Sequence, residues 1–523
     1  MLGRLSSFPE ARLLRENEAR RADAHSPAAV VIGAGFGGLA AAVRLLVRGY
    51  RVTVVDRLEQ AGGRGRVFRQ DGFTFDAGPT VITAPFLFEE LWALAGERLA
   101  DHVELVPVDP FYRIRFDDGG EFDYSGSAER MREEVRRLSP SDVEGYEAFL
   151  RESERIFHVG FSALAHVPFD SPFDMARIAP SMIELESYRT VYGLVSKHVK
   201  NEKLRQVLSF HPLLVGGNPF STTSIYTLIA FLERKWGVHF PKGGTGALVR
   251  GLVELIERLG GSLRLGAEVR EIVLEGDRAR GVELADGERL AADIVVSNAD
   301  SAWTYRHLVP AHARKKWTNR RVDRMRYSMG LFVWYFGTDR TYDDVAHHTI
   351  LLGPRYKGLL DDIFERKVLA EDFSLYLHRP TLTDPSLAPE GHDAFYVLSP
   401  VPHLEGGVDW ETHAEPYRRA IERHLEETVL PGLASHVVSS RTLTPQGFLD
   451  DYLSFRGAAF GVEPVLRQSA YFRPHNKSED VRGLYFVGAG THPGAGLPGV
   501  LSSARILDTV VPDADRVRTE LGA

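Results

Sequence analysis

The sequence contains no cysteine among its 523 residues. Disulfides, thiolate metal sites, cysteine nucleophiles and cofactors attached through cysteine are therefore excluded, and we predict no metal site. A basic cluster with interleaved aromatic residues is also missing, and the net charge is −8. Because nucleic-acid binding depends on clustered positive charge, nucleic acid is not an expected partner.

Long hydrophobic runs are absent as well. No uncharged apolar segment is long enough to cross a bilayer, so no membrane-spanning helix is predicted. Residues 1–27 carry five arginines against four acidic residues and have no apolar core, which argues against a secretory signal. We expect this segment to be a disordered or loosely helical extension. The whole length exceeds what one hydrophobic core supports, which predicts two or three domains.

A glycine-rich strand–turn–helix unit is present at residues 28–56. Its predicted elements are a strand at Val30–Ile32, a helix at Leu39–Arg48 and a strand at Arg51–Val55. Gly33, Gly35 and Gly38 form a G-x-G-x-x-G pattern, which allows a tight turn, the approach of a pyrophosphate and close packing of helix on strand. Asp56 ends the second strand, where a carboxylate accepts hydrogen bonds from a ribose. The unit therefore predicts dinucleotide binding.

A second unit of this kind lies near the C-terminus. It consists of a predicted strand at Leu484–Val487, a glycine-rich loop and a helix from about Gly499. Two such units far apart in the chain favour FAD over NAD, because FAD is long and its flavin needs a second contact region. The predicted fold class is α/β, with a Rossmann-like FAD-binding domain built from separated chain segments, a mixed α+β substrate domain and a helical membrane-facing region.

The intervening chain alternates predicted helices and strands. The predicted helices include 143–157 and 224–232, and the predicted strands include 103–108, 261–272 and 280–284. After the second strand, a loop at Gly62–Gly63 precedes Arg64, whose guanidinium suits a bridging phosphate. In the segment 167–181, Asp174 and Arg177 lie three residues apart on one face of a predicted helix, among apolar neighbours. This pair is either functional or an ordinary helix ion pair.

Several of these stretches resemble the bacterial and fungal-type phytoene desaturases, which are carotenoid desaturases of the flavin amine-oxidase-like superfamily. The stretches are V-I-G-A-G-F-G-G-L-A, G-F-T-F-D-A-G-P-T-V-I-T, L-L-V-G-G-N-P-F, E-R-K-W-G-V-H-F-P-K-G-G-T-G-A-L-V, A-E-D-F-S-L-Y-L-H, S-L-A-P-E-G and L-Y-F-V-G-A-G-T-H-P-G-A-G-L-P-G-V. The first is shared across the superfamily, and the middle ones are much narrower. Asp56 departs from the family, whose members usually have glutamate there, but both residues can hold a ribose.

The resemblance implies site residues by motif. The ADP contacts would come from Gly33, Gly35, Gly37, Gly38 and Asp56, with Arg64 near the diphosphate. Val269 would contact the adenine through its backbone, and the diphosphate, ribityl chain and flavin would lie near Gly488, Gly490, Thr491, Gly499 and Val500. Asp174 and Arg177 match a carboxylate and a guanidinium near the substrate. Asp174 is the candidate base, because a carboxylate in an apolar segment gains basicity.

The resemblance also implies noncovalently bound FAD, a hydrophobic carotenoid substrate and peripheral attachment of a cytoplasmic protein to a membrane surface. Either a quinone or oxygen would accept the electrons. The predicted domains are an extension at 1–27, an FAD-binding domain at 28–95, 236–302 and 465–512, a substrate domain at 96–166 and 303–464, and a helical, membrane-associating region at 167–235.

The expected function is FAD-dependent desaturation of phytoene to lycopene or a less desaturated carotene. A saturated bond next to a double bond would lose a hydride to the flavin and a proton to a base. Two alternatives stay open. One is another FAD-dependent oxidoreductase of the superfamily, such as a hydroxycarotenoid 3,4-desaturase, a ketolase, an isomerase or an amine oxidase. The other is a non-catalytic flavin-fold chaperone or lipid carrier.

Overall fold

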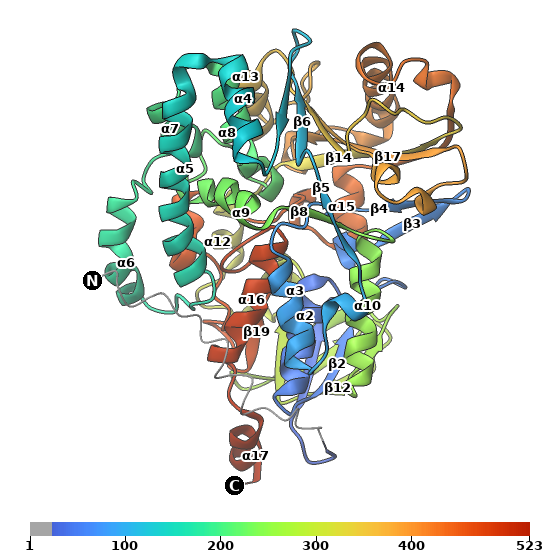
Figure 1. The fold of residues 1–523 in the computed structure, drawn as a ribbon. Coiled ribbons are helices and arrows are strands. Elements are labelled where there is room, and N and C mark those ends of the chain that lie inside the picture. The colour runs from blue at the N-terminus through green and yellow to red at the C-terminus, as the bar shows by residue number, and fades with distance from the viewer. Residues whose placement is uncertain (1–22, 523) are drawn as a thin grey trace.

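A five-stranded parallel sheet forms the lower part of the molecule in Figure 1. The computed structural model describes residues 23–522, so most of the predicted extension lies outside the described residues. The strand order is β19 (Leu484–Phe486), β13 (Ile294–Ser297), β1 (Ala28–Ile32), β2 (Arg51–Val55) and β9 (Ser262–Arg264). The two glycine-rich units thus contribute strands to one sheet. This confirms the prediction that the Rossmann-like sheet is built from separated chain segments.

Helix α2 (Phe36–Val47) begins directly after β1, and every one of its residues is buried. It packs against α10 (Thr245–Arg258) and α16 (Leu497–Val510). A helix enclosed on all sides needs an apolar surface all round, and its sequence provides one. Helix α2 approaches the sheet so closely that only glycine fits at position 38. A Cβ atom there would lie 2.0 Å from the carbonyl oxygen of Gly33.

The other face of the parallel sheet is covered by an antiparallel meander. Its strands are β10 (Val269–Glu275), β11 (Arg278–Leu284) and β12 (Arg289–Ala291). Val30 of β1 packs on this meander, whereas the next residue, Val31, packs on the α2 side. Burial of both faces explains why β1 reads as a continuous apolar run rather than an alternating one.

A seven-stranded sheet forms much of the upper part of Figure 1. Its order is β18 (Val437–Leu443), β14 (Gly330–Thr338), β17 (Asp393–Val401), β16 (Leu375–His378), β15 (His348–Leu351), β6 (Tyr112–Arg115) and β7 (Glu121–Tyr124). Strand β14 is buried throughout. Leu331 and Val333 face one hydrophobic core, and Phe332 and Trp334 face another, beneath α14 (Trp410–Thr428).

A layer of helices lies beside this sheet, with α6 at the outer edge of the view (Figure 1). These helices are α4 (Ala128–Leu138), α5 (Val143–Phe157), α6 (Pro172–Glu184), α7 (Val191–His198), α8 (Glu202–Ser209) and α9 (Leu228–Trp236). The remaining elements are β3 (Val67–Gln70), β4 (Phe73–Asp76), β5 (Leu105–Val108), β8 (Val238–Pro241), α3 (Pro85–Leu94), α11 (Ser301–Trp303), α12 (Asn319–Arg324), α13 (Tyr356–Asp361), α15 (Pro445–Tyr452) and α17 (Ala514–Gly522). Within residues 23–522, none of the helices has the length and hydropathy needed to cross a bilayer.

Two predicted elements are wrong in detail, although the helix predicted at 143–157 is confirmed. The strand predicted at 261–272 divides into β9 and β10, which belong to different sheets. Gly266 adopts a φ of +67° between them and turns the chain. The helix predicted at 224–232 begins as a 3₁₀ turn and becomes α-helical only at Leu228.

Candidate active site

A cavity of about 810 Å³ joins the glycine loops of the parallel sheet to the apolar face of the seven-stranded sheet. At one end it is lined by the loops that follow β1 and β19. At the other end it is lined by side chains such as Leu331, Val333 and Ile350. Small-molecule sites occupy about 300–1,000 Å³, so this cavity has room for a large ligand or for two ligands end to end.

The N-terminus of α2 faces the glycine end of the cavity. Gly33, Gly35 and Gly37 all line it. Gly35 is the N-cap, no side chain caps the helix, and its first turn contains no acidic residue. The first N–H groups of an α-helix have no partner within the helix and carry partial positive charge. This end of the cavity is therefore suited to a pyrophosphate.

Asn298 joins the two glycine loops. It follows β13 directly, and its Nδ2 donates to the carbonyl oxygen of Gly33 at 3.3 Å. A Cβ atom at Gly37 would lie 2.4 Å from Asn298 Oδ1 and 3.1 Å from the backbone of Gly488. The sequence analysis missed Asn298. The available signal was a polar residue at the carboxyl end of a buried parallel strand, where ligands bind in open α/β sheets.

A second residue that the sequence analysis missed holds the C-terminal glycine loop. The buried guanidinium of Arg473 donates to the carbonyl oxygens of Ala489, at 3.1 Å, and Val462, at 2.8 Å. The amide of Gly488 donates to Ser503 Oγ at 2.7 Å. Arg473 lies in no recognisable motif, and only the tertiary structure brings it to this loop.

Arg64 places a cation beside the first glycine loop. Its side chain lines the cavity, and Nη2 donates to Ser454 Oγ at 3.0 Å. Enclosure by protein lowers the pKa of Arg64, and the nearby Asp300 partly counteracts this effect. Burial likewise raises the pKa of Asp300, which also lines the cavity. Among the described residues, neither side chain has a salt bridge within 4.0 Å, so Arg64 is available to an anionic ligand.

The carboxylate of Asp56 lies at the end of β2 and lines the same end of the cavity. Oδ2 accepts from the amide of Ala34 at 2.7 Å, and Oδ1 accepts from the amide of Leu58 at 2.9 Å. Burial raises the pKa of Asp56, although these two hydrogen bonds oppose the shift. Each carboxylate oxygen has a second lone pair, so the group can hold the glycine turn and still accept from a ribose.

Most of the residues expected to contact the cofactor meet at this cavity. Those that line it are Gly33, Gly35, Gly37, Asp56, Arg64, Val269, Gly488, Gly490, Gly499 and Val500. Gly38 and Thr491 do not line it. Gly38 packs against Gly33, and the buried hydroxyl of Thr491 donates to the carbonyl oxygen of Pro474 at 2.6 Å. Both therefore shape the loops from behind.

Asp174 and Arg177 lie on α6, beside the cavity but outside its lining. Oδ2 of Asp174 accepts from the amide of Ser171 at 3.0 Å and completes a capping box at the start of α6. Arg177 Nη2 lies 3.9 Å from Asp174 Oδ1, and its side chain is 72% exposed. Met175 and Ile178, on the same helix, do line the cavity.

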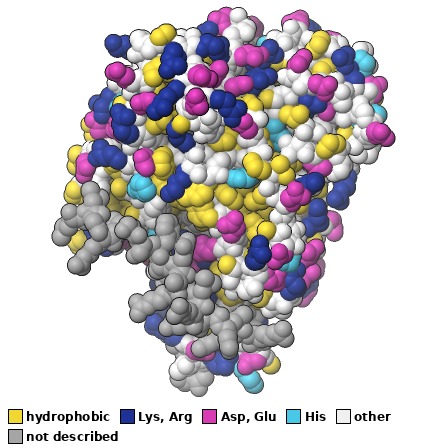
Figure 2. All heavy atoms as spheres, viewed as in Figure 1, with side chains coloured by type: hydrophobic (Ala, Val, Ile, Leu, Met, Phe, Trp, Pro, Cys, Tyr) yellow, Lys and Arg dark blue, Asp and Glu magenta, His cyan; other side chains and the backbone are white. Residues whose placement is uncertain are grey.

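The cavity opens to solvent among exposed apolar side chains near α6. Ile183, Tyr188, Leu466 and Phe472 all line the cavity and are also exposed. Phe173, at the start of α6, is 83% exposed. Hydrophobic side chains also gather across the middle of the face shown in Figure 2. Exposed apolar groups concentrated at a cavity mouth are typical of binding surfaces for apolar partners.

A buried carboxylate, that of Glu233, lies at the apolar end of the cavity and is hydrogen-bonded to two neighbouring side chains. Glu233 lines the cavity, accepts from the hydroxyl of Tyr112 at 2.7 Å and pairs with His211 Nε2 at 3.2 Å. Its neighbours along the cavity wall are apolar, including Leu213 and Leu232. This region can enclose a hydrocarbon and exclude water from it.

The sequence and fold of this chain are similar to those of known flavoproteins and phytoene desaturases. The model of a family described as flavin-containing amine oxidoreductase matches residues 36–506. A neurosporene-forming phytoene desaturase from Cereibacter sphaeroides is 50% identical over 497 residues, which cover 94% of this chain and 96% of that protein. A lycopene-forming phytoene desaturase from Pantoea ananas is 50% identical over 476 residues, covering 91% and 97%. The crystal structure of an oxidoreductase from Methanosarcina mazei has the same fold, with a TM-score of 0.59 at 20% identity, covering 93% and 100%.

Proposed function

The chain belongs to the phytoene desaturases of the flavin-containing amine oxidoreductase family, and from this premise we propose that it desaturates phytoene with FAD. The observation that carries the proposal is a continuous cavity, which connects a helix N-terminus suited to a pyrophosphate with an apolar chamber. A non-catalytic lipid carrier would need the chamber but not Arg64 and two glycine loops beside it.

The residues at the glycine end fit a bound dinucleotide. The uncapped N-terminus of α2 and the cation of Arg64 match a diphosphate. The carboxylate of Asp56 matches a ribose, and the loop at Gly488 and Gly490 leaves space for the far half of the cofactor. We propose that the FAD is held noncovalently; the absence of cysteine excludes a cysteinyl link.

When bound, the flavin supplies the acceptor for a hydride. The residues of this chain then have to hold an allylic carbon beside it, keep water out and receive the second hydrogen as a proton. Leu331, Val333 and Ile350 supply the apolar wall that aligns a hydrocarbon substrate. The reaction removes two hydrogens from adjacent carbons and leaves a new double bond conjugated with its neighbours.

For the proton we propose Asp174, with Arg177 as its charged partner. The support is that α6 contributes Met175 and Ile178 to the cavity wall, and Asp174 directly precedes Met175 on this helix. Oδ2 of Asp174 accepts from the amide of Ser171, which leaves other lone pairs for a proton, but to act as a base the carboxylate must turn towards the cavity that it does not line. A role in capping alone would leave the reaction rate unchanged, and this difference makes the assignment testable.

We also propose that the cavity mouth docks on a membrane. Phytoene is insoluble in water and has to enter from a bilayer, and the mouth exposes Phe173, Ile183 and Tyr188 on and beside α6. Apolar side chains in such a position insert into the interfacial region of a bilayer without crossing it. The enzyme would then work as a peripheral protein on the cytoplasmic face and pass electrons to a membrane quinone or to oxygen.

Pigment analysis in a host that accumulates phytoene tests the function. We expect the purified protein to carry flavin and the host to accumulate lycopene or neurosporene at the expense of phytoene. Production of lycopene would show that this enzyme carries out the full series of desaturations. Production of neurosporene would show that it stops after fewer steps. Flavin-loaded protein that leaves phytoene unchanged, but converts a hydroxycarotenoid or an amine, would overturn the proposal in favour of another oxidoreductase.

A further inference from the structure

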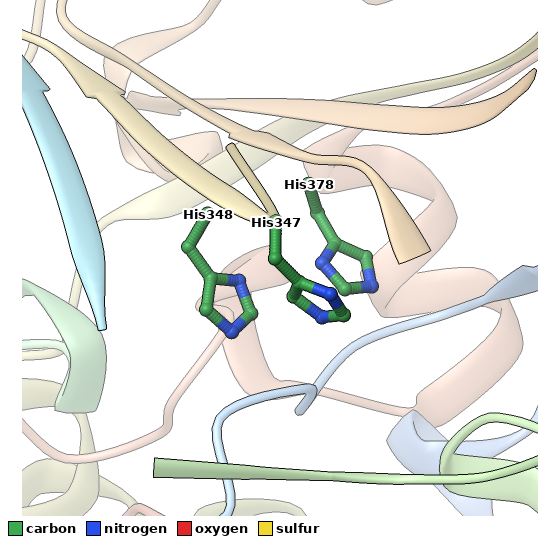
Figure 3. A group of neighbouring side chains, drawn as sticks. All are labelled: His347, His348 and His378. Atoms are coloured by element: carbon green, nitrogen blue, oxygen red, sulfur yellow. The ribbon is translucent and has the colours of Figure 1, made fainter. Parts of the chain in front are cut away.

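Three histidines lie together behind the cavity wall, away from the predicted cofactor site. His348 of β15 pairs in register with His378 of β16, and His347 directly precedes β15. All three are buried. Figure 3 shows their rings pointing into one small space, and one ring nitrogen from each lies within 4.8 Å of the others.

Two of the rings are oriented by hydrogen bonds through Nδ1. His347 Nδ1 lies 2.6 Å from Thr383 Oγ1, and His348 Nδ1 lies 2.7 Å from the hydroxyl of Tyr376. When these Nδ1 atoms carry the proton, Nε2 of each ring presents a lone pair. Metal-binding histidines commonly show this arrangement, in which the remote ring nitrogen donates to a neighbouring oxygen.

The remaining ring nitrogens have no hydrogen-bond partner within the described part of the chain. They are Nε2 of His347, Nε2 of His348 and the two nitrogens of His378, which has only a weak contact with the backbone of His347. Leaving a buried polar atom unpaired is costly, and buried polar groups in folded proteins are nearly always satisfied. His348 stacks on His378, and Phe240 makes a T-shaped contact with His347, but these contacts do not provide hydrogen bonds to the nitrogens.

Burial also keeps the rings neutral. Desolvation lowers the pKa of His347 to about 3, with a further contribution from Arg379. It also holds the pKa values of His348 and His378 well below the usual range. Neutral imidazole is the form that binds transition metals.

We propose that His347, His348 and His378 bind one transition-metal ion through three neutral imidazoles. Zn²⁺ and Cu⁺ match the ligand set, because both accept imidazole and adopt tetrahedral or trigonal sites. No carboxylate hydrogen-bonds to these rings among the residues described, and Arg379 lies nearby, so the lower charge of Cu⁺ is an advantage in this pocket. Two ring nitrogens bound to one ion at about 2.0–2.1 Å are roughly 3.4 Å apart, so nitrogens as far apart as 4.8 Å must move together by about 1.4 Å when the ion binds.

The site has a structural role rather than a catalytic one. The hydroxyl of Tyr376 bonds to His348 and also approaches Thr80 Oγ1 at 3.1 Å, and Tyr376 lines the cavity. A bound ion would fix His348 and, through it, this part of the wall. Since the histidines are buried, the ion has to enter during folding and exchanges slowly afterwards. The sequence analysis predicted no metal, because the ligands come from two strands and no compact motif unites them.

Metal analysis of the untagged wild-type flavoprotein tests the proposal directly. We expect one ion per chain after growth with zinc or copper, and renewed uptake when protein unfolded in chelator is refolded with either ion. Identification of the ion separates Zn²⁺ from Cu⁺. For zinc, X-ray absorption should show nitrogen neighbours at about 2.0–2.1 Å. Metal-free protein after both treatments would overturn the proposal.

Variants separate this site from metal held on surface histidines. His378→Gln should abolish binding. Thr383→Val, which removes only the partner of His347, should weaken it by about 10–100-fold. His413→Gln, on the exposed surface of α14, should retain the ion fully. If His378→Gln does not fold, the metal content of Thr383→Val and of the wild-type protein still tests whether the histidines bind an ion. Wild-type metal content in Thr383→Val and His378→Gln would refute the assignment.

Discussion

Gly35 shows how one missing side chain leaves room for a ligand. Its backbone is extended, with φ −75° and ψ 174°, so a larger residue would meet no backbone strain there. Gly35 lines the cavity, and a Cβ atom there would lie 3.0 Å from Asn298 Nδ2, which would have to shift by a few tenths of an ångström. Substitution at this position therefore reports on occupancy of the pyrophosphate site rather than on folding.

We expect Gly35→Val to fold but to purify without FAD. The measurement is the flavin absorbance per chain, and far-ultraviolet circular dichroism serves as the folding control. Asp56→Ala should weaken FAD binding more mildly, because it removes one or two charge-assisted hydrogen bonds. A valine variant that retains full flavin occupancy would show that the dinucleotide does not cross this loop.

At Asp174, two roles predict different results. If it is the base, Asp174→Asn should keep FAD and slow desaturation by about 10²–10⁴, because the amide keeps the shape but loses the basicity. The matched control is Ser171→Ala, which removes the hydroxyl of the same capping box and should leave the rate unchanged. The readout is carotene formed per bound flavin. A wild-type rate in Asp174→Asn would reduce Asp174 to a helix cap worth about 1 kcal/mol.

Helix α6 exposes large apolar side chains that water solvates poorly. None of its residues is fully buried, and the apolar side chains of Phe173 and Ile183 are 83% and 67% exposed. Because neither side chain contributes to a core, replacing them should not unfold the protein. Their contribution should appear only when an apolar phase is present.

We expect Phe173→Ser combined with Ile183→Ser to lose most of the vesicle binding seen in flotation assays. Each large apolar side chain contributes about 1.5–3 kcal/mol when fully buried, so the pair should change partitioning more than tenfold. Leu382→Ser, which alters a 50% exposed leucine away from the cavity mouth, is the matched control. Equal flotation of the double variant and wild type would exclude α6 as the docking surface.

Elements with a strong local signal were predictable, and those set by tertiary contacts were not. The units at 28–56 and near residue 490 carry turn glycines and buried β-branched runs, so their strands and helices were found. The strand predicted at 261–272 was wrong because one apolar pattern runs through Gly266, where the chain passes to another sheet. Asn298 and Arg473 were missed, since each acts through residues distant in sequence.

At the scale of the whole molecule, a buried arginine ties the chain's distant segments together. Arg44 of α2 donates to Asp508 of α16 at 2.6 Å and to Glu90 of α3 at 2.9 Å. Burial raises the pKa of Glu90, but Arg44 and Arg505 outweigh it, so the net pKa lies below the usual value. These bonds hold both glycine-rich units in one domain.

Arg44→Met should destabilise the protein by about 1–3 kcal/mol, because Asp508 loses its hydrogen bond with Arg44 and Glu90 keeps only Arg505, at 3.5 Å. Arg155→Met, whose ion pair with Glu184 is exposed, should cost less than about 1 kcal/mol. Since the pKa of Glu90 is depressed on folding, its contribution is present above the unfolded pKa of about 4.3 and is lost as pH falls below it. Denaturant titrations should show the gap between Arg44→Met and wild type narrowing in acid. A gap that does not change with pH would contradict this account.

The position of β19 at the edge of the parallel sheet has a consequence for how the protein is made. During synthesis, β1, β2 and β13 leave the ribosome long before residues 484–486 do, so β13 keeps one edge unpaired in the interval. The loop that completes the cofactor site follows β19, and its supporting helix, α16, is translated after that loop. Cofactor loading must therefore wait until β19 and α16 have been translated, and until then the nascent chain presents an open strand edge and an apolar chamber that chaperones would have to shield.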